Sequence, residues 1–256
     1  MKKTILTSLA IVLTVAVAFS QSFSTSGLKV TKSENTQYRA PSATYAITQS
    51  DNTTTIVTGN SISCNFGGLH ADNYYSRVFD LSTDFGINED IAISSIDFGI
   101  ETASAGAGGS QPATVNIYTL VGIYEFANLT LIATQAISVD DQAETILNVP
   151  ISAIIPAGSV LVVEFFTPDG QTAGNSFFIG SNALGQTGPS YIASPSGCSI
   201  TEPKSISDIG FPDMHIVMTV HADPASPSVP LSNWALLVGV LLMLTFMVVR
   251  YRRRMA

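Results

Sequence analysis

The chain has 256 residues and a formal net charge of −8 at pH 7. Residues 21–230 contain all 19 acidic residues but only five of the 11 basic ones, so this central segment carries a formal charge of −14. A charge of this sign repels phosphate backbones, which excludes nucleic acid as a partner. The roughly 210 residues of the segment are enough for one domain with its own core.

The N-terminus is typical of a secretory signal peptide. Two lysines precede an apolar stretch from Ile5 to Phe19, and the small residues Ala18 and Ser20 occupy the −3 and −1 positions of a cleavage site. We therefore expect residues 1–20 to be removed on export. An uncleaved N-terminal anchor is the alternative.

Residues 21–43 form a polar leader. They are rich in Ser, Thr, Asn and Gln and show no apolar period. This composition favours a disordered segment over a packed one. The folded ectodomain is then expected at residues 44–223.

The ectodomain shows the period of strands rather than of helices. Short alternating apolar runs are separated by Gly, Pro, Asn and Asp, a pattern that favours an all-β fold. We predict an antiparallel β-sandwich, jelly-roll-like in type. The expected strands lie within residues Ile91–Ile100, Val115–Thr119, Leu129–Val139, Val160–Val163, Phe177–Ile179 and Met214–Val220.

The chain contains two cysteines, Cys64 and Cys198. In an exported protein such a pair predicts a disulfide. Closing a loop of this length is worth on the order of 5 kcal/mol in the chain-entropy model. Two buried free thiols are the alternative, and the absence of a Cys-x-x-Cys motif disfavours a zinc site.

Three phrases of the ectodomain are similar to a known but uncharacterised module. They are Tyr74–Leu81, Gly174–Asn182 and Phe211–His215. Together they resemble a β-sandwich module of exported bacterial proteins that often stands beside hydrolase domains. The resemblance spans residues 60–222 and implies no catalytic residues.

Catalytic patterns are weak throughout the chain. There is no Gly-x-Ser-x-Gly motif, and the three histidines are His70, His215 and His221. We place His70 in a polar loop near Cys64, and the other two on one face of the final strand, about 20 Å apart and too far to share a metal. We therefore predict that the protein is not an enzyme. A hydrolase with an unrecognised carboxylate pair is the alternative.

A dense acidic segment is the best candidate for a metal site. Its oxygen-bearing residues are Asp80, Asp84, Asn88, Glu89 and Asp90. Calcium binds six to eight such oxygens, so a structural calcium ion is a hypothesis here, although the spacing is not that of an EF-hand. A solvated acidic loop is the alternative. No other cofactor is expected.

Arg77 is the one basic residue between Arg39 and Lys204. An arginine in so acidic a domain is expected to pair with a neighbouring carboxylate. We interpret the pair as stabilising the sandwich rather than as gripping a substrate.

Aromatic residues offer a second type of binding surface. If several share one exposed face, they can stack against sugar rings, whereas half-buried packing is the alternative. The residues considered are Tyr74, Tyr75, Tyr118, Tyr124, Phe126 and Tyr191.

The C-terminus combines a stalk, an apolar helix and a basic tail. Residues 224–233 hold a Pro/Ser-rich stalk and a short motif, residues 234–249 the expected transmembrane helix, and residues 250–256 the tail. At 1.5 Å per residue, Leu231–Val249 reaches about 28 Å, just enough for a hydrocarbon core of about 30 Å. The residues that resist translocation and keep the tail cytoplasmic are Arg250, Arg252, Arg253 and Arg254.

The short motif consists of Val229, Pro230, Leu231, Ser232, Asn233 and Trp234. With the helix and the arginines it resembles the tripartite sorting signals of the PEP-CTERM kind, in the variant read as Ile-Pro-Thr-Leu-Ser-x-Trp. Val229 replaces the Ile, and the Thr is missing. The resemblance covers about thirty residues and implies an exosortase-type transpeptidase that removes the helix and passes the ectodomain to the cell surface or extracellular matrix. A plain membrane anchor is the alternative.

These patterns together predict an exported protein that is membrane-anchored or processed by a sortase-type enzyme. Its β-sandwich is expected to be structural or adhesive at the cell surface, outer envelope or matrix. The alternative is a surface carbohydrate-binding module, calcium-dependent or not, with extracellular polysaccharide as its partner.

Overall fold

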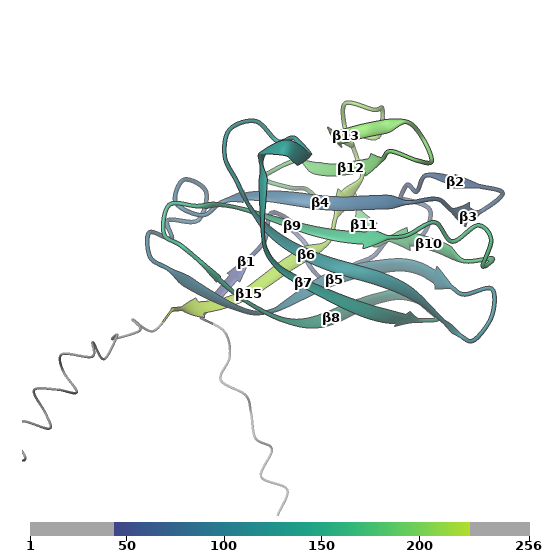
Figure 1. Ribbon diagram of the computed structural model, residues 1–256, viewed down its shortest axis with the longest axis horizontal. Coiled ribbons are helices and arrows are strands. Elements are labelled where there is room, and N and C mark those ends of the chain that lie inside the picture. Colours follow the sequence, from purple (N-terminus) through teal and green to yellow (C-terminus); the bar gives the residue numbers. More distant parts are fainter. Residues whose placement is uncertain (1–43, 226–256) are drawn as a thin grey trace, which may run out of the picture. The chain divides into compact units, whose positions relative to one another are not determined.

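The computed structural model describes residues 44–225 (Figure 1). The signal peptide, the leader, the sorting motif, the membrane helix and the arginine cluster lie outside these residues and stay predictions. Within residues 44–225, no helix has the length and apolar character needed to cross a membrane.

The described residues form an antiparallel β-sandwich, which confirms the predicted all-β fold. Besides one 3-10 turn, η1 (Phe126–Asn128), every regular element is a strand. The strands are β1 (Tyr45–Ile47), β2 (Asn65–Phe66), β3 (Leu69–His70), β4 (Asn73–Asp80), β5 (Ile91–Ser104), β6 (Ser110–Leu120), β7 (Leu129–Asp140), β8 (Gln142–Ile155), β9 (Val160–Thr167), β10 (Ser176–Ile179), β11 (Ser181–Asn182), β12 (Ser190–Ser194), β13 (Ile200–Ser205), β14 (His215–Ile216) and β15 (Met218–Pro224).

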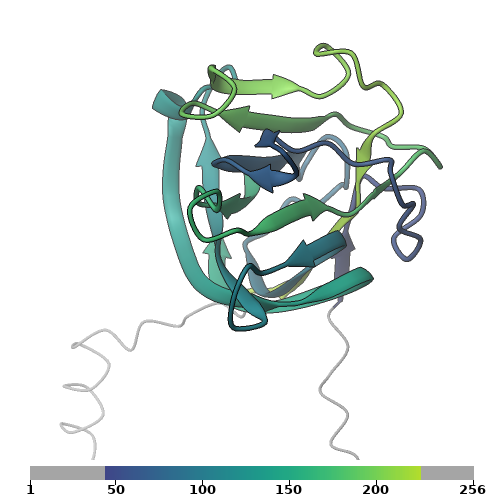
Figure 2. The same ribbon diagram turned by 90° about the vertical axis from the view of Figure 1, so that its right-hand side faces the viewer.

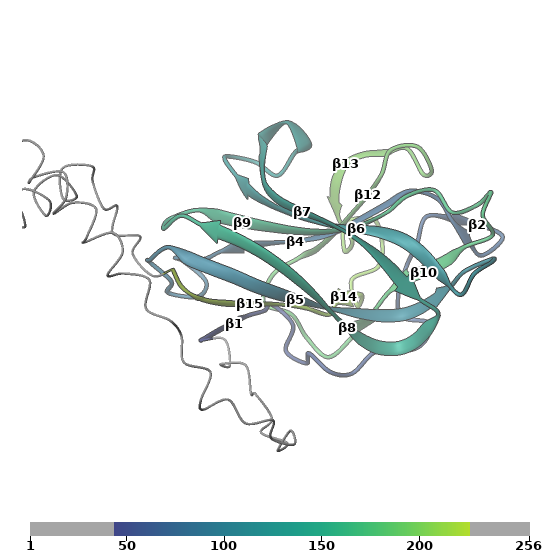
Figure 3. The same cartoon turned by 60° about the horizontal axis from the view of Figure 1, so that its bottom comes forward.

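Two sheets make the layers of the sandwich (Figure 3). One sheet has six strands in the order β13-β12-β4-β9-β6-β7. In the other, β8 runs along one side of β5, while β15 and β10 follow one another along its other side and β1 pairs with β15. Every pairing between these strands is antiparallel. Figure 2 views the strands from one end of the sandwich.

Every second side chain along the strands points inward and fills the space between the sheets. On β5, Ile96, Phe98 and Ile100 are fully buried, and the residues between them include the partly exposed Asp97. Phe98 meets Phe165 edge to face, with ring centroids 4.9 Å apart, and Phe165 stacks on Phe177 at 5.3 Å. Such period-2 burial is what the sequence pattern predicts for strands that bury one face.

Several strands were not expected from the sequence. β8 contains Pro150 at its middle, and proline demotes a candidate strand because it cannot donate to a ladder. The structure accommodates Pro150 because β8 is an edge strand. The expected final strand is also interrupted, since Val217 separates β14 from β15 and the two pair with different partners.

The predicted disulfide between Cys64 and Cys198 is confirmed, with the two Cα atoms 5.9 Å apart. It joins the segment before β2 to the turn between β12 and β13. The carboxylate of Asp72 holds the same turn, because it accepts hydrogen bonds from the backbone of Ser196 and Gly197. A covalent link and a buried acceptor thus tie one end of the sandwich together.

The prediction that Arg77 pairs with a carboxylate is wrong for the described residues. Its side chain is 0% exposed, and no carboxylate among residues 44–225 forms an ion pair with it. The guanidinium instead donates to the carbonyl of Ile216 from Nε at 3.0 Å and Nη2 at 2.5 Å, and to the carbonyl of Gly188 at 3.0 Å. Weaker contacts at 3.4 Å reach Gln49 Oε1 and Ser50 Oγ.

The reason for this arrangement is that Arg77 points into the core from β4. There it meets the carbonyl of Ile216 in the two-residue strand β14 and the carbonyl of Gly188 in the loop before β12, and buried carbonyls of this kind need donors. A guanidinium carries five donors in a planar fork and therefore binds several carbonyls at once. Burial lowers the pKa of Arg77 to about 10, so the group remains charged at neutral pH.

We predict that Arg77→Ala lowers the free energy of unfolding by about 3 kcal/mol or more, because buried carbonyls lose their donors and a cavity remains. Arg77→Lys is expected to recover only part of the loss, since an ammonium cannot span the same acceptors. Urea unfolding of the full chain, followed by circular dichroism, measures both. The matched control is Lys204→Ala at an exposed site, expected to change stability by less than about 0.5 kcal/mol. Equal losses for the alanine variants at 77 and 204 would contradict the role of Arg77.

Candidate functional site

A groove lies between β7 and β8, the edge strands of the two sheets. Its volume is about 430 Å³. The lining residues are Gln135, Ile137, Ser138, Leu147, Asn148, Val149 and Pro150. None of these seven side chains is ionisable.

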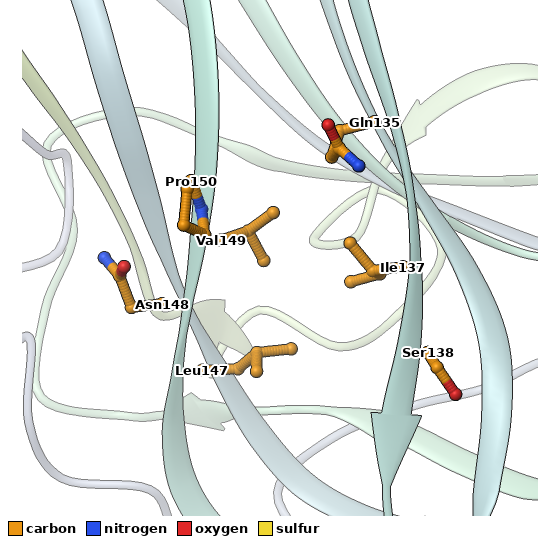
Figure 4. A pocket seen from close by; sticks show the side chains of 7 residues that line it. All are labelled: Gln135, Ile137, Ser138, Leu147, Asn148, Val149 and Pro150. Atoms are coloured by element: carbon orange, nitrogen blue, oxygen red, sulfur yellow. The ribbon is translucent and has the colours of Figure 1, made fainter.

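The strand register explains the character of the groove. Ile137 and Gln135 lie opposite Ala113 and Val115 of β6, which are buried between the sheets. Leu147 and Val149 are likewise on the inward face of β8 and point toward Ile137 across the groove, whereas Ser138 and Asn148 point away from it (Figure 4). The walls are therefore apolar, with one amide at Gln135.

The rim of the groove on the β7 side is a long exposed strand edge. Between Leu129 and Val139, β7 carries no charged residue and no proline. Most of its residues are exposed, including Leu131 at 52% and Ile132 at 38%. The rim on the β8 side differs in two ways. Pro150 has no backbone N–H to donate, and the ladder between β8 and β5 shifts register between Ile93 and Ser95.

Aromatic residues gather on the opposite, outward face of the six-stranded sheet. Of the six residues considered in the sequence, Tyr75 lies in the core with 0% exposure. The other five are half-buried, and four of them make ring contacts in two separate pairs. Tyr74 contacts Phe126 and Phe166 at 5.6 and 4.4 Å between ring centroids, and Tyr124 contacts Tyr191 at 4.9 Å.

The loop between β6 and β7 covers this face. The hydroxyl of Tyr124 donates to Ser76 Oγ at 2.7 Å, and the backbone of Phe126 donates to Glu202 at 2.9 Å. The aromatic rings are thus partly used for internal packing.

Glu164 lies beneath the aromatic face, and sequence analysis did not identify it. It is 1% exposed on central strand β9, and it accepts hydrogen bonds from Asn116 Nδ2 at 2.9 Å and from the Tyr118 hydroxyl at 3.2 Å. Burial raises the pKa of Glu164, and the two hydrogen bonds oppose that shift. A carboxylate within the apolar run Val160–Phe166 was the signal available in the sequence.

Three carboxylates of the acidic segment that was considered for calcium accept hydrogen bonds from different groups. Asp80 accepts hydrogen bonds from Ser82 and Thr83, which lowers its pKa, while Asp90 accepts from the backbone of Ala157. Glu89 accepts from the hydroxyl of Tyr45. In residues 44–225 no three His, Cys, Asp or Glu side chains cluster in a way suited to a metal ion. Asp84 and Asn88 are exposed.

The three histidines lie in separate environments. His70 is not in a polar loop as expected, but is 1% exposed in β3 and bonded to Gln111 and to the Ala71 carbonyl. His215 accepts a hydrogen bond from the backbone of Gly185. His221 contacts Asp97 at 2.7 Å across the β5–β15 ladder.

Comparisons with known proteins assign no family. No protein-family model matches the chain, and no curated protein matches its sequence. Among solved structures the chain is similar to the cysteine protease and lectin-like domains of Cwp84, a surface layer associated protein of Clostridium difficile, with 14% identity and a TM-score of 0.40. The similarity covers 64% of this chain and 35% of that chain, so the chain spans about a third of that structure. A similarity of this size carries no functional argument.

We predict a pH-dependent effect of Glu164→Gln. Because burial raises the pKa of Glu164, the folded state holds the proton more tightly than the unfolded state does. Its stabilising contribution is full below the unfolded pKa of about 4.3 and is lost as the pH rises through the folded pKa. The free energy of unfolding of the Gln variant, relative to that of the parent, should therefore increase as the pH rises from 4 to 8. Denaturant unfolding of the full chain at several pH values measures this.

Tyr118→Phe is the complementary variant. It removes a donor to the Glu164 carboxylate, so its loss of stability should be larger at pH 8 than at pH 4. Parallel pH profiles for the parent and Glu164→Gln would show that the carboxylate is not held in the environment described.

Proposed function

We propose that the chain is an exported surface protein whose β-sandwich binds a ligand without catalysis, as an adhesive or structural module. The observation that carries the proposal is the groove between β7 and β8. Its apolar walls and single inward amide suit binding. Proton transfer and nucleophilic catalysis instead use titratable or activated side chains.

Two further observations support a place outside the cytosol. The disulfide between Cys64 and Cys198 is of a kind that persists in oxidising compartments. The ectodomain's strongly acidic composition favours solubility at an exposed surface. Anchoring through residues 234–249 and processing by an exosortase-type enzyme remain part of the proposal.

The ligand expected in the groove is extended and uncharged where it enters. An unpaired strand edge offers backbone donors and acceptors beside the apolar pockets of Ile137, Leu147 and Val149. A polypeptide strand matches both features, because its backbone pairs with the edge and its alternate side chains fill the groove.

We predict that Leu147→Asn weakens attachment of the protein to intact producing cells by about tenfold, since a polar amide replaces the apolar wall. The measurement is titration of the labelled full chain, in detergent micelles, onto these cells. Ile154→Asn is the matched control, because Ile154 lies on the same strand outside the groove and is 64% exposed. Undiminished attachment of the Leu147 variant would exclude the groove as the ligand site.

Carbohydrate binding is the second candidate, and the gathered aromatic residues support it. A glycan array probed with the full chain separates the two surfaces. Loss of glycan binding in Tyr191→Ala, with retention in Leu147→Asn, would move the site to the aromatic face. Sensitivity to a chelator would in addition favour calcium at the segment from Asp80 to Asp90.

Sorting predicts a definite mature C-terminus. Mass spectrometry of the protein recovered from the producing cells should find its last residue within Pro230–Trp234, because the transpeptidase removes the helix. Recovery of a peptide containing Arg254 from the surface-exposed form would instead support a plain membrane anchor.

A further inference from the structure

The edge of β7 is unlike the other sheet edges in the described part of the chain. β1 and β10 have three and four residues. β13 has six, with Pro203 and Lys204 among them. β8 has Pro150. Natural proteins blunt sheet edges by shortness, charge, proline or bulges, because an open edge templates pairing with another strand. β7 is 12 residues long, and its one irregularity is a register shift near Ile132.

The charge distribution points to the occupant of this edge. Residues 44–225 contain 18 acidic and two basic residues, so a second copy of the chain is repelled from most of the surface. From Leu129 to Val139 the edge carries no charge. An acidic second copy of the chain can therefore approach β7 with less repulsion than it meets at the charged parts of the surface.

We propose that β7 pairs antiparallel with β7 of a second copy, which joins two six-stranded sheets into one continuous sheet. This inference deepens the proposed function, since its biological meaning as adhesion rests on that proposal. The pairing itself rests on the strand edge alone.

The strand is self-complementary when the two-fold axis passes beside Gln135. Gln135 then faces its own copy, and each amide has both a donor and an acceptor to offer. Ala133 faces Ile137 of the second copy on the inward side, and Thr134 faces Ala136 on the outward side. Small residues thus lie opposite larger ones, and no charged pair is brought together.

Antiparallel pairing is favoured over parallel pairing by the acidic end of β7. A parallel pair sets Asp140 of one copy beside Asp140 of the other, about 5 Å away. The antiparallel pair separates the same residues by about 34 Å, several times the Debye length of about 8 Å at physiological salt. The turn residue Asp141 strengthens this preference.

The antiparallel geometry sets the orientation of the two copies. β7 begins at the end of the sandwich at which the described chain leaves. Leu129, at the start of β7, pairs with Leu120 of β6, and Leu120 pairs with Val160 of β9. The turn before β9 donates a backbone hydrogen bond to Asp90, which also accepts one from Ala225. Antiparallel copies therefore send their Ala225 ends in opposite directions. The contact links two opposing surfaces, which is adhesion between surfaces rather than within one.

The test reconstitutes the full chain into two populations of phosphatidylcholine vesicles, labelled with a donor and an acceptor dye. Energy transfer on mixing reports docking between vesicles. The variant is Gln135→Glu, which changes little in shape but places two carboxylates opposite each other. We expect the apparent dissociation constant to rise about tenfold at pH 7. At about pH 4 and below, protonation should restore docking. The unsubstituted chain is measured at each pH.

Gln171→Glu is the matched control, because it adds the same charge at an exposed loop away from β7 and should leave docking unchanged. Failure of the unsubstituted chain to dock, or equal docking by the Gln135 variant, overturns the pairing. Energy transfer that appears only when both dyes are reconstituted into the same vesicles overturns the antiparallel orientation. Docking that requires added polysaccharide shows that the occupant is a glycan. If docking fails while Leu147→Asn still reduces attachment to cells, the pairing is wrong and the proposed function stands.

Discussion

A buried positive charge that has no carboxylate partner within residues 44–225 holds distant segments of this sandwich together. Arg77 lies at 0% exposure, and its guanidinium binds carbonyl groups of Ile216 and Gly188. Ile216 lies in the short strand β14 and Gly188 in the loop before β12, and buried carbonyls at both places need hydrogen-bond donors. The same network includes Gln49 and Ser50, so one side chain joins the N-terminal segment, β4 and the region before β15.

The two faces of the six-stranded sheet are stabilised by different means. The inward face follows the ordinary pattern of apolar side chains, with Phe165 between Phe98 and Phe177. The outward face buries a carboxylate, Glu164, beneath a loop held by Tyr124 and Phe126. A carboxylate in that position needs the donors of its neighbours, because desolvation without them disfavours the charged form.

Sequence reasoning succeeded where the information is local. The alternation in Ile91–Ile100 and the doubly apolar run Val160–Val163 correspond to β5 and the central strand β9. Sequence reasoning failed where contacts with a distant segment decide whether a strand forms or which acceptor a side chain binds. The strand β8, which contains Pro150 and pairs on one side only, was not among the expected strands. Arg77 was assigned a carboxylate, although its nearest acceptors are carbonyls distant in sequence. The sequence analysis named the six aromatic residues. Their spacing along the chain could not show that Tyr75 is buried or that the loop carrying Tyr124 folds over the sheet.

The sequence by itself determined the all-β class, the positions of the strongest strands and the pairing of Cys64 with Cys198, because each follows from period, composition or elimination within the chain. Only the tertiary structure decided which strands lie at the sheet edges, and therefore where the groove and the open edge of β7 occur. Strand order is set by pairing between segments far apart in the sequence. No local pattern in Leu129–Asp140 records that one side of this strand has no neighbour.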